Sequence, residues 1–543
     1  MNVREVATKP YNDQKPGTAG LRKKVSVFQQ PHYLENFLQA IFDVDLRLAG
    51  ARLVIGGDGR YHNREAIQTA LRIAAANGVK HAIVGQGGLL STPAASHAIR
   101  RHNAAGGFLF TASHNPAGPD GDFGIKFNVA GGGQASESIT GRIYEVSRTI
   151  SRYRIVDAEP VDLDRRGSSR LGDMEVEIID CVDDYAALMQ QLFDFDQIRS
   201  WFRAGHRIRF DAMHAVTGPY ARRIFIDLLG APEDSLQNAI PLEDFGGGHP
   251  DPNLIYAKHL VDVMYGPDAP DFGAASDGDG DRNMIVGRGM FVSPGDSLAM
   301  LAAHLHRLPG YKGGLVGVAR SMPTCRAVDK VAAAIDLPCF ETPTGWKFFA
   351  NLLDANRITL CGEESFGTSS NHTREKDGVW AALAWINILA ATGHSVAEIA
   401  QQHWRRYGRH YYARHDYEAL SLKVADKVMD AMRSTQTELS GKPFADYEVT
   451  LADEFGYEDP IDGSRAEAQG LRIVFGDHAR IVLRKSGTGT QGATLRLYLE
   501  RYETDPERLD WSTAEALKPI VDIADRLVRI GELTGRKAPD VVT

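Results

Sequence analysis

Alternating strand and helix patterns along the first two-thirds of the chain constrain its fold more than any other feature. Short runs of buried-type apolar residues are separated by stretches whose apolar residues recur at helical spacing. Comparable groups of this kind start near 52, near 207 and at a strand expected over 314–318. Such alternation predicts helices layered on largely parallel sheets, an α/β fold. In the first group we expect strands at 52–55, 81–84 and 107–111 and helices at 65–77 and 93–102.

The last part of the chain has a different pattern. Strand-like runs at 447–451, 471–475, 480–484 and 494–500 precede one helical run at 513–530, which predicts an α+β unit. A length of 543 residues suits several domains. We therefore predict three α/β domains at 1–190, 191–305 and 306–415, and an α+β domain at 416–543.

Charge and composition exclude several classes of protein. The chain has 61 Lys and Arg against 70 Asp and Glu, a net charge of −9, without the basic stripe that nucleic acid or anionic lipid needs. Its most apolar later stretch, 381–391, is too short to span a bilayer. The four cysteines lack CxxC spacing, which argues against zinc or disulfide frameworks. We predict a cytoplasmic monomer or homodimer that binds a small molecule and has no nucleic acid or membrane partner.

One polar loop, TASHNP at 111–116, follows a predicted strand. Open α/β sheets place their ligands at the carboxyl ends of strands. Ser113 could therefore act as a nucleophile or phosphate carrier, and a glycine-rich turn with a capping serine is an equally good interpretation. The loop lacks the G-x-S-x-G pattern of the α/β-hydrolases.

A second loop, DGDGDR at 277–282, also follows a predicted strand. Asp277, Asp279 and Asp281 alternate with glycines, so their carboxylates can converge on one hard divalent cation. An EF-hand would need glycine and glutamate where Arg282 and Arg288 stand. Three unpaired carboxylates would repel one another, so a metal is favoured over a solvated acidic turn. Arg282 suggests that an anion such as a phosphoryl group binds beside the metal.

Two further loops carry weaker signals. The segment CGEESFG at 361–367 could bind sugar hydroxyls, although an acidic loop before a buried helix explains it as well. Thr344 and Gly345 precede a predicted helix and could contribute backbone amides. The segment from Arg484 to 490, with Arg496 beyond it, combines cations, hydroxyls and free amides, which favours phosphate binding over a plain hairpin turn.

Taken together, these loops resemble the α-D-phosphohexomutase superfamily. The resemblance runs in order over nearly the whole chain, through GTAGLR, TASHNP, DGDGDRN, CGEESFG with REKDG, and SGTGTQGATLRLY. The full sequences of the motifs CGEESFG and REKDGVWAALAW are more similar to the glucose-phosphate branch of the superfamily than to its mannose-phosphate or glucosamine-phosphate branches. The resemblance implies four domains around a central cleft, three of them similar α/β domains with mixed sheets and the last a smaller α+β domain. Lys485 departs from the family pattern, where an apolar residue is expected, and could retune phosphate affinity.

The resemblance also implies roles for individual residues. Ser113 would carry the phosphoryl group and, with Asp277, Asp279 and Asp281, would ligate Mg²⁺. Lys126 or His114 would be the general acid or base, and the residues alone do not rank the two. The implied cleft-lining cations are Arg22, Lys126, Arg282 and Lys376; the implied substrate contacts are Thr344, Gly345, Glu363 and Ser365; and the implied clamp on the distal phosphate is Arg484, Ser486, Gly487, Thr488 and Arg496.

The implied activity is an isomerase reaction, the reversible interconversion of glucose 1-phosphate and glucose 6-phosphate. It would proceed through a phosphoserine enzyme with glucose 1,6-bisphosphate as intermediate and activator, and with Mg²⁺ as cofactor. The alternatives are a mutase of mannose or glucosamine phosphates, a non-catalytic sugar-phosphate-binding protein, and a metal-dependent phosphatase. A dianionic phosphoserine would repel a phosphosugar, which is why both a cation and nearby Arg and Lys side chains are required.

Overall fold

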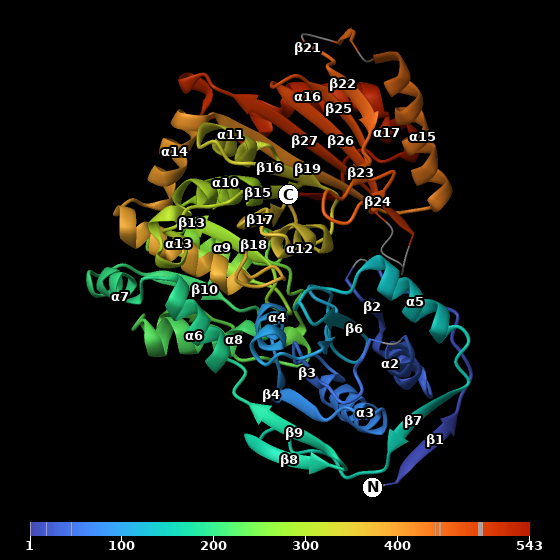
Figure 1. Ribbon diagram of the computed structural model, residues 1–543. Coiled ribbons are helices and arrows are strands. Elements are labelled where there is room, and N and C mark those ends of the chain that lie inside the picture. Colours follow the sequence, from blue (N-terminus) through green and yellow to red (C-terminus); the bar gives the residue numbers. More distant parts are fainter. Residues whose placement is uncertain (1, 18, 45, 440, 445–446, 487–491) are drawn as a thin grey trace.

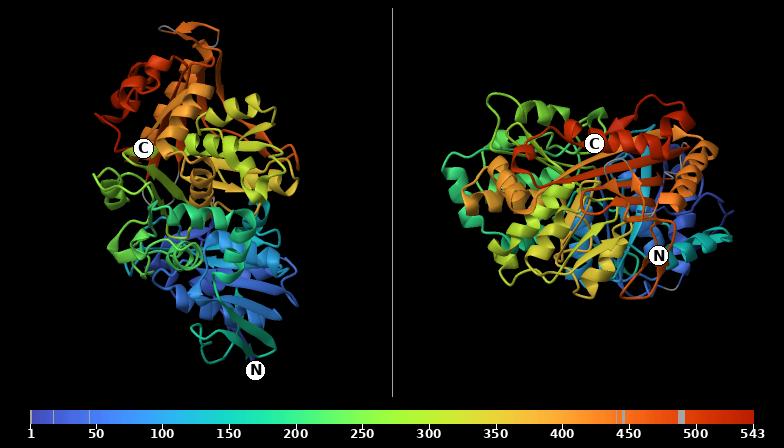
Figure 2. Two further views of the ribbon diagram at one scale, coloured as in Figure 1. Left: turned by 90° about the vertical axis from the view of Figure 1, so that its left-hand side faces the viewer. Right: turned by 90° about the horizontal axis from the view of Figure 1, so that it is seen from above.

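In the described part of the chain, four sheets of four or more strands follow one another, and Figure 1 shows them in order from blue to red. The computed structural model describes residues 2–17, 19–44, 46–439, 441–444, 447–486 and 492–543. The first sheet lies at one end of the molecule and the fourth at the other, with the second and third between them (Figures 1 and 2). This confirms the predicted class of three α/β units with mixed sheets and a C-terminal unit of different build.

The first sheet has seven strands in the order β2-β6-β5-β3-β4-β9-β8. A separate antiparallel pair, β1 (Val3–Ala7) with β7 (Arg152–Val156), lies outside it. The strands of the sheet are β2 (Leu21–Lys24), β3 (Arg52–Gly57), β4 (His81–Leu89), β5 (Gly106–Phe110), β6 (Asp122–Val129), β8 (Gly167–Leu171) and β9 (Met174–Ile179). Its helices are α1 (Val25–Phe28), α2 (Tyr33–Asp43), α3 (Asn63–Ala76), α4 (Thr92–Arg101) and α5 (Glu137–Ser147).

The second and third sheets are smaller. The second contains β10 (Ile208–Asp211), β11 (Leu236–Gln237), β12 (Phe272–Ser276), β13 (Asn283–Gly287) and β14 (Met290–Val292), with helices α6 (Asp183–Leu192), α7 (Phe195–Arg203), α8 (Thr217–Ala221) and α9 (Lys258–Met264). The third contains β15 (Val318–Ser321), β16 (Cys339–Thr342), β17 (Leu360–Glu363) and β18 (Gly367–Ser370), with helices α10 (Pro294–His304), α11 (Ala327–Ala334), α12 (Lys347–Asp354), α13 (Gly378–Thr392) and α14 (Val396–Tyr407).

The fourth sheet is antiparallel throughout, in the order β22-β25-β26-β27-β19-β28. Two short strand pairs, β20 (Pro443–Phe444) with β21 (Tyr447–Glu448) and β23 (Tyr457–Glu458) with β24 (Arg465–Ala466), extend from it. Its strands are β19 (Arg409–Leu420), β22 (Leu451–Glu454), β25 (Leu471–Phe475), β26 (Ala479–Ser486), β27 (Ala493–Glu503) and β28 (Val541–Val542), and its helices are α15 (Leu422–Leu439), α16 (Thr513–Val528) and α17 (Ile530–Thr534).

The first three sheets share a four-strand unit. Its order is β4-β3-β5-β6 in the first sheet, β11-β10-β12-β13 in the second and β16-β15-β17-β18 in the third. In each unit the first three strands are parallel and the fourth is antiparallel to its neighbour. The polar loops at 111–121, 277–282 and 364–366 therefore occupy the same topological position, between the third and fourth strands.

Two sequence-based expectations about elements were wrong. The strand expected at 314–318 is β15 at Val318–Ser321, because Gly314 has a left-handed φ of +84° and the pairing with β16 and β17 begins only at Val318. The strand expected at 447–451 is divided between β21 and β22. In both cases an apolar run extended into a turn, which periodicity alone does not reveal.

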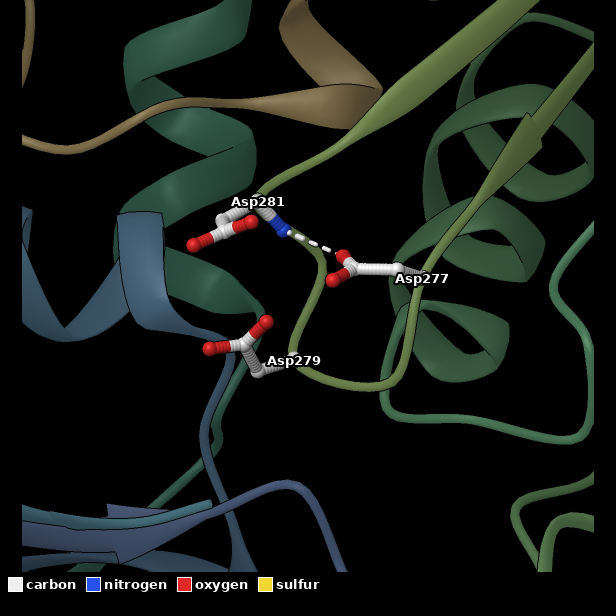
Figure 3. Close-up of side chains that lie close together, drawn as sticks. All are labelled: Asp277, Asp279 and Asp281. Carbon is white, nitrogen blue, oxygen red and sulfur yellow. Dashed lines mark hydrogen bonds between the residues drawn. The ribbon is translucent and has the colours of Figure 1, made fainter. Parts of the chain in front are cut away.

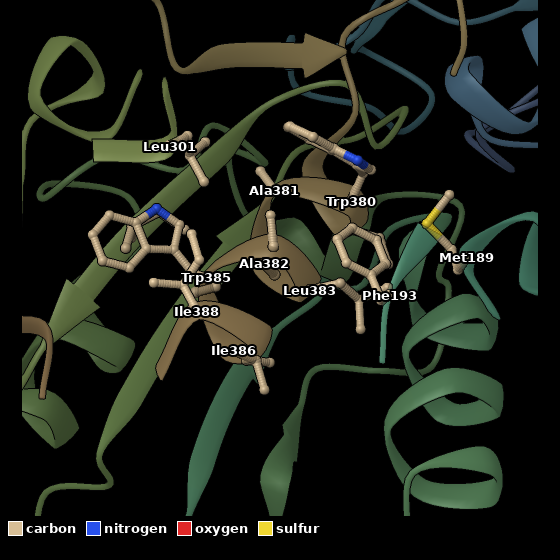
Figure 4. Close-up of a cluster of buried hydrophobic side chains, with 14 of the residues drawn as sticks. Met189, Phe193, Leu301, Trp380, Ala381, Ala382, Leu383, Trp385, Ile386 and Ile388 are labelled. Carbon is tan, nitrogen blue, oxygen red and sulfur yellow. The ribbon is translucent and has the colours of Figure 1, made fainter. Parts of the chain in front are cut away.

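Helix α13 is the most buried helix that the described chain places between the second and third units (Figure 4). Apolar residues occur on every side of this helix, as expected of a helix that is enclosed, and its buried Asn387 donates to Gln197. Asp377 caps its start by accepting a hydrogen bond from the Trp380 amide, and Gly393 ends it in the left-handed conformation. Trp385 donates from its indole nitrogen to Ser297 of α10 at 2.9 Å, so its one polar atom is satisfied.

The residue boundaries of the domains remain a proposal that these elements refine. The predicted boundaries at 190 and 415 fall inside α6 and β19, and a domain boundary does not divide a helix or strand. Helix α10 packs on α11 and β17 of the third unit. We therefore propose divisions just before α6, α10 and β19.

No single helix in the described part of the chain is long and apolar enough to cross a membrane. Helices α13 and α14 pass such a test only as a pair bent by 84°, and most of α13 is packed inside the protein.

Candidate active site

Three loops from three different units meet at one point. The Ser113 hydroxyl donates to Asp277 Oδ2 at 2.9 Å, which joins the loop after β5 to the loop after β12. The Asn283 amide donates to the Phe366 carbonyl at 2.7 Å, which joins the β12–β13 loop to the β17–β18 loop. The site is therefore built where the equivalent loops of the three units converge.

Ser113 is held in an uncommon backbone conformation. Its φ is +54°, in the left-handed region that costs a non-glycine residue free energy. Its amide donates to Thr111 Oγ1 at 2.7 Å, and its carbonyl accepts from Arg60 Nη2 at 2.7 Å. Arg60 is itself fixed by a buried ion pair with Asp58, which also accepts from the Thr111 hydroxyl. These contacts over-determine the conformation and aim the hydroxyl at the aspartates.

The three aspartates form a potential metal site (Figure 3). One carboxylate oxygen from each of Asp277, Asp279 and Asp281 lies within 4.8 Å of the other two, and all three residues are buried. Asp277 Oδ1 accepts the amides of Asp281 and Arg282 at 2.9 and 3.0 Å, whereas Asp279 Oδ1 is buried without a hydrogen-bond partner. Burial and the carboxylates of Asp281 and Asp279 raise the pKa of Asp277 well above its ordinary value. An oxygen-only set under such repulsion fits a hard divalent cation.

Four cations surround the triad. Lys126 Nζ lies 2.6 Å from Asp279 Oδ2, and Lys376 Nζ lies 3.2 Å from Asp281 Oδ1. Arg282 pairs with Asp251 at 2.8 Å. Arg22 lies on β2; burial lowers its pKa, and the nearby carboxylates of the triad oppose that shift. All four cations that the sequence analysis expected to line the site thus lie near the triad.

The two candidates for the general acid or base differ in charge. Burial lowers the pKa of His114 well below its ordinary value and nearby Arg282 and Arg22 lower it further, so its imidazole is neutral at pH 7. Its Nδ1 lies 3.4 Å from Ser113 Oγ. For Lys126, burial acts to lower the pKa, the carboxylates it contacts raise it, and the net shift is upward. Lys126 is therefore an ammonium group, suited to charge stabilisation rather than to accepting a proton.

The β17–β18 loop lies next to the loop before α12. The Gly345 amide donates to Glu363 Oε1 at 2.9 Å, and burial raises the pKa of Glu363. Thr344 Oγ1 is buried without a hydrogen-bond partner, and Ser365 is half-exposed on the same loop as Glu363. Hydroxyl, amide and carboxyl groups are thus gathered beside the aspartates, as expected for a site that binds a polyhydroxylated ligand.

The fourth unit contributes the predicted phosphate-clamp residues. Arg484 donates to the Gln469 carbonyl at 3.0 Å, and Arg496 lies 3.8 Å from Asp416. Strand alternation places Ser486 on the same face of β26 as Arg484. Lys485 points to the other face, where it pairs with Asp426 of α15. Gly487 and Thr488 lie outside the described residues.

Models of one family match the chain in four successive segments. They are described as phosphoglucomutase/phosphomannomutase α/β/α domains I, II and III, at 13–154, 183–289 and 294–407, and as a phosphoglucomutase-1 C-terminal domain at 409–540. The chain belongs to the phosphoglucomutase/phosphomannomutase family. This confirms the expected superfamily and the expected enzyme class, an isomerase that transfers a phosphoryl group.

Relatives in this family match over the full length of the chain. A curated phosphoglucomutase of Rhizobium radiobacter is 54% identical over 541 residues, covering 100% of both chains. One of Schizosaccharomyces pombe is 50% identical over 554 residues, again covering 100% of both. The open-form crystal structure of Paramecium parafusin, described as a phosphoglucomutase, superposes with a TM-score of 0.92 at 48% identity, covering 100% of this chain and 99% of that one.

Several residues at this family's site were not predicted from the sequence. Asp58 and Arg60 directly follow β3, which was a predicted strand. Because α/β sheets place ligands at the carboxyl ends of their strands, this position could have identified both residues as candidates. Thr92 starts α4 and donates to Asp279 Oδ2 at 2.7 Å, a contact between units that no local pattern reveals. Glu375 lies inside the REKDG motif and received no role.

Proposed function

We propose that the protein catalyses the phosphoglucomutase reaction, the reversible interconversion of glucose 1-phosphate and glucose 6-phosphate. The observation that carries the proposal is the position of the Ser113 hydroxyl, 2.9 Å from Asp277 within a buried triad of aspartates. The full-length curated relatives that are named phosphoglucomutases support the same reaction.

In the proposed cycle, phospho-Ser113 donates its phosphoryl group to the free hydroxyl of the hexose monophosphate. The P–O bond to the serine breaks, a P–O bond to the sugar oxygen forms, and the proton that leaves the sugar hydroxyl is balanced by the proton that the serine oxygen gains. The product, glucose 1,6-bisphosphate, then turns over and returns its other phosphoryl group to Ser113. Mg²⁺ held by the three aspartates would supply positive charge against the phosphoryl oxygens.

The chain's own side chains would stabilise the transferring charge, move the proton and orient the sugar. Lys126 and Lys376 lie beside the triad, 2.6 Å from Asp279 and 3.2 Å from Asp281, and would stabilise the negative charge of the transferring group. We assign the proton transfer to His114, because its neutral imidazole reaches Ser113 Oγ whereas Lys126 already carries a proton. Glu363 and Ser365 would orient the sugar, and Arg484 with Arg496 would hold whichever phosphate is not reacting.

The test is an assay of glucose 6-phosphate formation from glucose 1-phosphate with Mg²⁺ and a trace of glucose 1,6-bisphosphate. We expect turnover by the wild type and nearly none by Ser113→Ala, while the matched surface variant Ser138→Ala keeps wild-type activity and all three share one far-UV circular dichroism spectrum. Intact-mass spectrometry should show a phosphorylated fraction in the wild type that substrate discharges. Folded wild-type protein without turnover, or with a clear preference for mannose or glucosamine phosphate, would reject the proposal. The cytoplasmic location and the monomeric or dimeric state remain predictions from the sequence.

A further inference from the structure

Glu375 is a fully buried carboxyl group at the junction of the first and third units. Its Oε1 accepts from Asn128 Nδ2 at 2.9 Å, and its Oε2 accepts from Gln134 Nε2 at 3.0 Å. Asn128 is on β6, and Gln134 pairs with it across the turn that follows this strand. A side chain of the third unit therefore holds the end of a strand of the first unit by hydrogen bonds to both of its oxygens. We call these two hydrogen bonds, from Asn128 and Gln134 to Glu375, the Glu375 grip.

This grip lies between the two lysines of the site. Lys126 is two residues before Asn128 on β6, so both side chains project from the same face of the strand. Lys376 directly follows Glu375 in the chain. Lys126 reaches Asp279 and Lys376 reaches Asp281, so the two ammonium groups approach the triad from different units. Glu375 is bonded to the strand that carries one lysine and is the chain neighbour of the other.

The rest of the segment is anchored on both sides of Lys376. The Arg374 amide donates to Ser96 Oγ at 3.0 Å, and its guanidinium pairs with Asp354 at 2.5 Å. Asp377 accepts from the Tyr185 hydroxyl at 2.6 Å. These contacts anchor the segment at Arg374 and Asp377, and the two hydrogen bonds of Glu375 join it to the strand of Lys126 and to the turn that follows that strand.

We propose that Glu375 is a positioning residue that holds Lys126 and Lys376 at a fixed separation across the aspartate triad, where both meet the transferring phosphoryl group. The inference rests on the proposed function. A carboxylate is the side chain that accepts hydrogen bonds from two amides at once, so glutamine cannot reproduce the grip without turning one partner around. The ammonium groups of the two lysines would then shift relative to each other by a fraction of an ångström. Such a shift raises the free energy of the transition state more than it weakens substrate binding.

The grip also depends on pH. Burial raises the pKa of Glu375 to about 7, although the ammonium of Lys126 acts in the opposite direction. The charged groups that act on the carboxyl are Lys126 from β6 and Asp281 from the β12–β13 loop. Its chain neighbours Arg374 and Lys376 pair instead with Asp354 and Asp281. Below that pKa the protonated form has one acceptor fewer for the two amides. We therefore expect turnover to rise as the pH increases through about 7.

The decisive variant is Glu375→Gln, assayed with Mg²⁺ between pH 5.5 and 8.5, values chosen to bracket a pKa of about 7. At pH 8 we expect kcat to fall by about tenfold or more with KM within about threefold of wild type, the pattern of an interaction needed in the transition state. The rise through neutral pH should disappear. The matched control is Asp354→Asn, which removes an anchor of the same segment and should retain the wild-type pH profile. A Glu375→Gln enzyme with wild-type kcat, or with the same pH rise, overturns the inference, whereas an inactive wild type would instead overturn the proposed function.

A second variant keeps the test available if Glu375→Gln does not fold. Gln134→Met removes one of the two donors to the carboxylate from a half-buried position. Because hydrogen bonds to the charged form lower a carboxyl pKa, the pH rise should move upward by about one unit. An unmoved pH profile in folded Gln134→Met would contradict the proposal.

Discussion

Gly278 is the point at which the serine loop and the aspartate loop touch, and Gly278→Ala tests whether their spacing controls the reaction. A Cβ at Gly278 would lie 2.3 Å from the Ser113 carbonyl oxygen and 3.2 Å from its carbon, whereas real Cβ contacts essentially never come under 3.0 Å. The two loops must therefore separate by at least about 0.7 Å. The neighbour is main chain fixed by Arg60, so it cannot rotate away as a side chain would.

The expected effect is large on turnover and modest on stability. Misplacement by close to 1 Å can reduce a rate by about 100-fold, and overpacking of this kind costs about 1–3 kcal/mol of unfolding free energy. The measurements are kcat for glucose 1-phosphate and the urea midpoint of unfolding. Gly313→Ala is the matched control, because an added Cβ there meets nothing within 4 Å. If Gly278→Ala retained kcat within about threefold of the control, the reasoning that loop spacing positions Ser113 would be refuted.

Three further predictions address the metal, the cleft and pH. Asp279→Asn, or chelation of the wild type by EDTA, should lower turnover by about 100-fold or more. Added Mg²⁺ should restore the turnover of the chelated wild type but not that of the variant. A chelated enzyme with full activity would contradict the metal site. Lys485→Ala should change KM and kcat by less than about twofold, because Lys485 pairs with Asp426 on the face of β26 opposite to Arg484. A larger rise in KM would show that it does contact substrate. Burial lowers the pKa of His403 to about 3, so in acid the folded state binds fewer protons there than the unfolded state does. The free energy of unfolding should therefore fall as the pH drops below about 6.5. His403→Phe should make the melting temperature depend less on acid, and calorimetry at pH 5 and pH 7 would detect or disprove this difference.

Much of this architecture was predictable because its signals are local. A buried strand such as β12 and the helix that begins at Asp377 depend on apolar periodicity and on caps within a few residues. The site loops were recognisable for a related reason, since a glycine-rich polar segment that follows a strand lies at the edge where α/β sheets bind ligands. The element boundaries at 314–318 and 447–451 were missed where a turn interrupted an apolar run.

By itself, the sequence determined which chemistry is present: a serine, three alternating aspartates, and cations distributed over motifs far apart in the chain. It could not show that Thr92 bonds Asp279, that Arg60 holds the Ser113 carbonyl, or that Glu375 grips Asn128. Only the tertiary structure decided these contacts, because each joins residues that lie 53 to 247 positions apart in the chain. The physical reason is that three units with the same strand order present equivalent loops, and the packing of the units brings those loops to one point.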